Sequence, residues 1–100
     1  MAADPIVVPL SPVLDLSAAA PLAADLLALR GRPVRLDASH TERLGGLCLQ
    51  VLISARNAWA TDQTLFEIAE RSAAFDEALT LFGARELFQP GVPGGEGPMT

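Results

Sequence analysis

The hydrophobic positions of this chain fall into short runs with the spacing of strands and longer stretches with the spacing of helices. Apolar and polar residues alternate in the clearest short run, which indicates a half-buried strand. The strands expected from such runs lie at residues 6–8, 34–38 and 65–69. Another run at residues 13–16 is separated from the first by Pro9 and Pro12. Because proline cannot donate to a strand ladder, this N-terminal part predicts either two short strands or one broken edge strand.

Leucine spacing predicts a first helix between the first two of these strands. Leu22, Leu26 and Leu29 recur every three or four residues, so they form one stripe that would face a sheet. Ser17 stands before this stripe as a plausible N-cap, and Gly31 follows it as a helix terminator.

Two more helices are expected further along the chain. Residues 45–60 are apolar on most sides of a helix, which predicts the most buried helix of the fold. Ser72 is the expected N-cap of the last helix, whose buried stripe would contain Phe75, Leu79 and Phe82.

The order of these elements is β-α-β-α-β-α, which indicates an α/β fold with helical crossovers. We therefore expect a single α/β domain at residues 1–88, built from a small mixed β-sheet with packed helices. Residues 89–100 are rich in Pro and Gly and have little to bury, so they are expected to form a flexible tail.

Composition narrows the classes of function. Half of the 100 residues are hydrophobic, which is enough for one core, and the formal net charge is −5. The seven basic residues are all Arg and are not clustered, so nucleic acid is not an expected partner. No apolar run approaches the roughly 20 residues that span a bilayer, so we expect a cytoplasmic protein without direct membrane insertion.

The most informative segment runs from Val34 to Ala55: an extended apolar run, a polar loop, and an apolar helix that opens on Gly45-Gly46. This segment resembles the STAS domain, the fold of anti-sigma-factor antagonists. The sequences Leu14-Asp15-Leu16 and Leu81-Phe82-Gly83 are similar to the start and finish of such domains. The resemblance covers residues 6–88 and rests on the order and spacing of these pieces.

The resemblance implies a protein-docking surface that lacks its usual switch. In STAS domains the loop before this helix usually carries an Asp followed by a phosphorylatable Ser or Thr. Here Gly45 stands in place of the Asp and Gly46 in place of the hydroxyl. No phosphorylation is therefore expected at the family position. Ser39 is a weak substitute, because it more simply closes a turn after Asp37.

The resemblance places the partner contact on the loop and on the start of the following helix. The residues expected to bind a partner are Asp37, Ser39, His40, Thr41, Arg43, Gly45, Gly46 and Leu47. For the two glycines an equally weighted alternative is that they only let the chain turn into a tightly packed helix.

Other candidate residues have simpler structural interpretations. His40 is a lone loop histidine without nearby metal-ligand spacing, and Cys48 is most simply a small buried hydrophobe. Trp59 is either an exposed interface anchor or a cover for the end of the core. The sequence contains no phosphate-binding loop, nucleophile elbow or metal-ligand motif, so we expect no catalytic residue, metal or cofactor.

These observations lead to the hypothesis of a non-enzymatic regulatory or adaptor protein of bacterial origin. The resemblance offers three settings, of which we rank a chemotaxis-type histidine kinase and response-regulator system first. The alternatives are antagonism of an anti-sigma factor with a kinase-like ATPase fold and the STAS subunit of a phospholipid-transport ABC complex. An enzyme or small-molecule binder is a remote alternative. A weak homodimer, with Trp59 or the strand near Ile6 as the contact, is compatible with the main hypothesis.

Overall fold

The computed structural model describes residues 4–88. Its strands are β1 (Ile6–Pro9), β2 (Val13–Leu14), β3 (Val34–Ala38), β4 (Arg43–Leu44) and β5 (Phe66–Arg71). Its helices are α1 (Ala19–Ala28), α2 (Gly46–Thr61) and α3 (Ala73–Leu81), with the short 3-10 turns η1 (Leu16–Ala18) and η2 (Arg85–Phe88). The expected α/β class is confirmed, and the N-terminal residues form two separate short strands.

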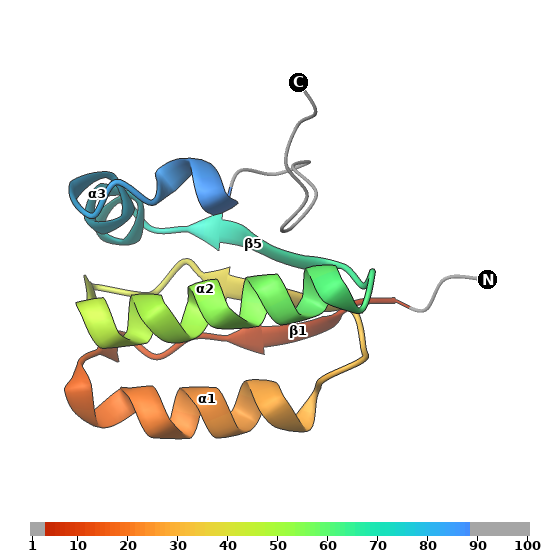
Figure 1. The fold of residues 1–100 in the computed structure, drawn as a ribbon. Coiled ribbons are helices and arrows are strands. Elements are labelled where there is room, and N and C mark those ends of the chain that lie inside the picture. The colour runs from red at the N-terminus through yellow and green to blue at the C-terminus, as the bar shows by residue number, and fades with distance from the viewer. Residues whose placement is uncertain (1–3, 89–100) are drawn as a thin grey trace.

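The strands form a three-stranded sheet in the order β1-β3-β5 and a two-stranded pair of β2 and β4. All of these pairs are parallel, so the expectation of a mixed sheet is corrected. The two strands of every pair are separated in the sequence by a helix. This helix carries the chain back to the end of the sheet where the first strand began, so the second strand runs in the same direction. In Figure 1, α2 crosses the sheet between α1 and α3.

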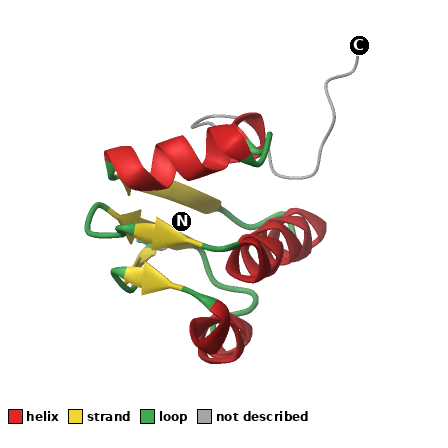
Figure 2. Cartoon of the chain, turned by 90° about the vertical axis from the view of Figure 1, so that its left-hand side faces the viewer, coloured by secondary structure: helices red, strands yellow, loops and turns green. Residues whose placement is uncertain are grey.

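Helices α1 and α2 pack against each other on one face of the sheet, as Figure 2 shows. The central strand β3 explains this arrangement. Val34, Leu36 and Ala38 are fully buried beneath the helices, whereas Arg35 and Asp37 lie half-buried on the opposite face. The alternation seen in the sequence thus divides β3 between a core face and a polar face.

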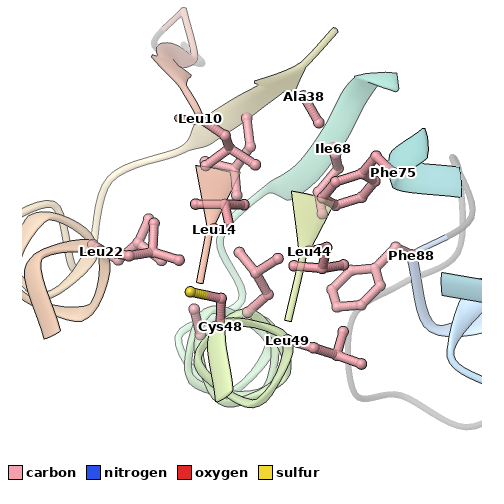
Figure 3. Close-up of a cluster of buried hydrophobic side chains, with 14 of the residues drawn as sticks. Leu10, Leu14, Leu22, Ala38, Leu44, Cys48, Leu49, Ile68, Phe75 and Phe88 are labelled. Atoms are coloured by element: carbon pink, nitrogen blue, oxygen red, sulfur yellow. The ribbon is translucent and has the colours of Figure 1, made fainter. Parts of the chain in front are cut away.

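The core extends beyond the sheet to side chains of all three helices and of η2. Figure 3 shows Leu22 entering the cluster from α1, while Phe75 and Phe88 lie with Leu44 on another side. Phe88 is held from outside as well, because Arg56 donates a 2.6 Å hydrogen bond to the Leu87 carbonyl and Arg71 donates to the Phe88 carbonyl. Burial and hydrogen bonds together fix η2 on the domain.

Two helix boundaries differ from the sequence prediction. Ser17 does not cap α1; instead Asp15 caps η1, and its carboxylate accepts hydrogen bonds from the Ser17 backbone N–H and hydroxyl. Ser72 caps α3 as expected, with its hydroxyl accepting from the Phe75 N–H at 3.0 Å. However, α3 ends at Leu81, so Phe82 turns away from the buried stripe and is 49% exposed.

Trp59 belongs to the core, not to an exposed surface. Its side chain is 2% exposed, its ring packs at a tilt against Phe66, and its indole N–H donates a 2.6 Å hydrogen bond to the Arg32 carbonyl. The donor that burial would otherwise leave unsatisfied is thereby paired. Of the two interpretations of Trp59, the structural one is confirmed, and the exposed interface anchor is excluded.

We predict that Trp59→Phe lowers the free energy of unfolding by about 1–3 kcal/mol, because it removes a buried hydrogen bond and part of a packed ring. Urea denaturation followed by far-ultraviolet circular dichroism measures the loss. The matched control is Leu27→Ala at an exposed position of α1, expected to change stability by less than about 0.5 kcal/mol. Equal stability of Trp59→Phe and wild type would contradict the core assignment.

Candidate functional site

The candidate site lies at the start of α2, where the two glycines meet the end of β2. Gly45 is the extended N-cap residue of α2, and no side chain caps this helix. The Gly45 N–H donates a 2.8 Å hydrogen bond to the Leu14 carbonyl, which ties the helix start to β2. A residue without a side chain is needed here because the two backbone segments approach so closely.

The two glycines differ in the space around them. A Cβ at Gly45 would lie 3.3 Å from the backbone oxygen of Leu14, which is a tight contact with an atom that cannot easily move. A Cβ at Gly46 would lie 3.8 Å from the Phe82 ring, which is ordinary van der Waals distance. Packing therefore disfavours a side chain at position 45, whereas position 46 has room for one.

Three exposed apolar side chains surround this helix start, each from a different element. Leu47 in the first turn of α2 is 50% exposed, Leu16 in η1 is 76% exposed, and Phe82 after α3 is 49% exposed. The Phe82 ring lies beside Gly46, and η1 contacts α2. We call Leu16, Gly46, Leu47 and Phe82 the α2 entrance surface.

Leu16 and Phe82 are additions to the residues expected from the sequence. Helical spacing assigned Phe82 to the buried stripe of α3, and Leu16 was grouped with the strand that contains Leu14. Both are exposed, and each lies just beyond an element that ends one or two residues earlier than the pattern suggested. The only sequence signal for them was their position beside an expected element boundary.

The polar loop expected to bind a partner follows β3, at the same end of the sheet as the start of α2 (Figure 1). The Asp37 carboxylate accepts a 2.9 Å hydrogen bond from the Ser39 N–H, forming the expected turn. Hydrogen bonds from the Ser39 side chain, and then from its backbone, lower the pKa of Asp37. Ser39 and His40 are exposed, with 3.2 Å between the Ser39 hydroxyl and the His40 Nδ1.

Thr41 differs from its neighbours in this loop because it points into the fold. Its side chain is 1% exposed, and its hydroxyl donates a 3.1 Å hydrogen bond to the Ser11 carbonyl. Its own carbonyl accepts a hydrogen bond from the Ser72 hydroxyl. Thr41 therefore fixes the loop between two distant segments. It is not part of the accessible surface, whereas Arg43 on β4 is exposed.

Cys48 connects η1 to α2 from the inside. The residue is fully buried, and its Sγ lies 3.2 Å from the Asp15 carbonyl oxygen, to which it donates. Burial, and then the nearby negative charge of Asp15, raise the pKa of this thiol. A thiol that stays protonated is a poor nucleophile, so Cys48 acts as the small buried residue that its sequence context indicated.

Two carboxylates of the described chain, those of Glu67 and Asp76, are held in ion pairs with arginines. Glu67 forms a 2.7 Å ion pair with Arg35, and Asp76 forms ion pairs of 3.2 Å with both Arg71 and Arg85. Among the described residues, no three His, Cys, Asp or Glu side chains form a group that could hold a metal ion. Within residues 4–88, no helix is both long enough and apolar enough to cross a membrane.

A comparison with models of protein families identifies the family to which the domain belongs. The family model described as "Mlab, STAS domain" matches residues 1–89, so the chain belongs to the STAS domain family. This match confirms the resemblance on which the site residues were chosen. No curated protein and no solved structure shows significant similarity to the chain. STAS domains are in general regulatory and protein-binding modules.

We predict opposite effects for alanine at the two glycines. Gly45→Ala should lower the free energy of unfolding by about 1–2 kcal/mol, because its Cβ crowds the Leu14 carbonyl. Gly46→Ala should leave stability unchanged or raise it by up to about 1 kcal/mol, because alanine restricts the unfolded chain and favours helix. Thermal and urea denaturation of both variants measure the difference; equal losses would contradict the distinct packing of the two positions.

Proposed function

We propose that this STAS domain is a non-enzymatic adaptor that docks on a signalling protein through the α2 entrance surface and the exposed loop residues Ser39, His40 and Arg43. The observation that supports the proposal most directly is the exposure of Leu16, Leu47 and Phe82 on three elements that adjoin one helix start. Isolated exposed apolar residues are common on proteins, but a group contributed by three elements is typical of an interaction site.

We further propose that docking is not controlled by phosphorylation of this chain. Gly46 has no hydroxyl, and Thr41 is buried and hydrogen-bonded. Ser39 is accessible, but its backbone already closes the Asp37 turn. Binding would therefore be constitutive or regulated from the side of the partner.

Our preferred setting is a bacterial, cytoplasmic chemotaxis-type system containing a histidine kinase and a response regulator. A partner with an apolar surface would fit Leu16, Leu47 and Phe82, whose burial on docking supplies the driving force. Antagonism of a kinase-like anti-sigma factor is the second setting, and loss of the family hydroxyl counts against it. A phospholipid-transport ABC complex is the third.

An enzymatic function receives less support from the arrangement of polar groups. The groove between α1 and α2 has one titratable lining residue, Arg30, and Asp62 already engages it in a 2.7 Å ion pair. Catalysis would need several convergent polar groups in one pocket. We therefore propose a binding role without an accompanying reaction.

The test is a pull-down from native host cells with tagged wild type, Gly46→Glu and Leu47→Glu. Both variants place a charged side chain on the α2 entrance surface, and an acidic residue in the first helical turn is compatible with folding. We predict that wild type recovers a histidine kinase or its response regulator and that both variants reduce recovery about tenfold or more.

Leu27→Glu is the matched control, because it adds the same charge at another exposed leucine, on α1. It should recover the partner as well as wild type does. Recovery of an anti-sigma factor or an ABC transporter would select the corresponding alternative setting. If Gly46→Glu and Leu47→Glu kept every partner, the α2 entrance surface would not be the interface.

A further inference from the structure

The short turn η2 is held in place by groups of other elements more than by its own structure. It has only four residues, and a 3-10 turn of that length has little stability of its own. The Leu87 N–H donates a 3.1 Å hydrogen bond to the Ala84 carbonyl. Phe88 is the buried residue of η2, with 6% of its surface exposed. The attachment of η2 therefore depends on the surface beneath it.

That surface contains an apolar pocket for an aromatic ring. In Figure 3 the Phe88 ring lies among Leu44, Leu49 and Phe75, which belong to the same buried cluster. These three residues come from β4, α2 and α3. Two arginines complete the surface, which we call the η2 groove: Leu44, Leu49, Arg56, Arg71 and Phe75.

The two arginines of the η2 groove hold the backbone of η2. Arg56 of α2 donates a 2.6 Å hydrogen bond to the Leu87 carbonyl, and Arg71 of β5 donates to the Phe88 carbonyl. Asp76 holds Arg71 from the other side through a 3.2 Å ion pair. Because both acceptors in η2 are main-chain atoms, these contacts would suit any peptide that follows the same path. The aromatic pocket is the part of the groove that selects a side chain.

The acceptors that η2 offers to these arginines are neutral. Arg56 bonds to the Leu87 carbonyl and to the Asn57 side-chain oxygen, and it belongs to no ion pair among residues 4–88. A carboxylate in the place of the Phe88 carbonyl would accept charge-assisted hydrogen bonds, which are roughly twice as strong as neutral ones. The groove is therefore better matched to an aromatic residue that carries its own carboxylate than to Phe88.

From these observations we propose that the η2 groove is a peptide-binding site that the chain's own η2 occupies at rest. Its ligand in trans is a peptide that ends in an aromatic residue with a free C-terminal carboxylate. The ring of the ligand takes the pocket of Phe88, and its carboxylate takes the position of the Phe88 carbonyl. Because η2 is tethered to the groove, it competes at an effective concentration on the order of millimolar. The carboxylate gives the ligand the advantage that it needs over η2.

Calorimetric titration of the full chain with a synthetic peptide tests the proposal. The peptide is acetyl-Ala-Arg-Glu-Leu-Phe with a free carboxylate, which repeats residues 84–88. We expect the Phe88→Ala chain to bind it at least about tenfold more tightly than wild type, because its own segment no longer fills the pocket. The same peptide with a C-terminal amide should bind this variant at least about tenfold more weakly than the acid.

A pair of arginine variants tests whether the groove makes the contact. Adding Arg56→Ala to Phe88→Ala should weaken binding of the acid peptide at least about tenfold, because one of the two backbone donors is lost. Adding Arg32→Ala is the matched control; it removes an exposed arginine in the loop before β3 and should leave the affinity unchanged. Circular dichroism verifies that the variants are folded.

Amide hydrogen exchange of wild type tests the proposal without any substitution. The acid peptide at millimolar concentration should accelerate exchange of the Leu87 N–H, because the peptide displaces η2 and opens the hydrogen bond to Ala84. Exchange of the β3 amides should not change, since β3 lies in the centre of the sheet.

Three outcomes would overturn the proposal: no binding of the acid peptide to a folded Phe88→Ala chain, equal binding of the acid and the amide, or unchanged exchange of Leu87 in wild type. The inference does not depend on the α2 entrance surface. Leu47→Glu should reduce partner capture and leave peptide binding unchanged, so failure of this inference and failure of the proposed function are distinguishable.

Discussion

The burial of β3 between two parallel neighbours is the constraint on which the rest of the molecule depends. Its inner side chains are completely excluded from solvent, so β1 and β5 must pair on both sides and α1 and α2 must cover the inner face. Because these pairs are parallel, each helix returns the chain to the same end of the sheet. The loop after β3 and the start of α2 therefore meet at one end, although no single residue of the site specifies that meeting.

Local patterns in the sequence predicted the elements that depend on residues close together in the chain. The alternation at residues 34–38, the apolar α2 segment and the Ser72 cap all follow from backbone geometry that repeats within a few residues. Strand β4 was missed because its two residues are too few to show a period, and it exists only by pairing with β2. For the same reason, a continuous loop was predicted before α2.

The accessibility of the site residues was less predictable because it depends on distant segments. Thr41 is buried because it bonds to Ser11, thirty residues earlier along the chain, and it is also held by Ser72, thirty-one residues later. Phe82 is half-exposed where its ring lies beside Gly46 of α2, and the groove between α1 and α2 depends on how these two helices pack. The family resemblance suggested the region of the candidate site, and the structure shows which of its side chains reach solvent.

The two glycines at the start of α2 differ in how readily each could be replaced by a residue with a side chain. At position 45 even a methyl group would lie 3.3 Å from the Leu14 carbonyl oxygen, so a side chain there would force the backbone to give way by a few tenths of an ångström. At position 46 the Cβ of a serine would lie at normal distance from the Phe82 ring, and its side chain would bring a hydroxyl to the helix start. The absence of a phosphorylatable group is thus a matter of one side chain and not of the architecture. A single substitution at position 46 would therefore give the proposed docking surface a group that a kinase could modify.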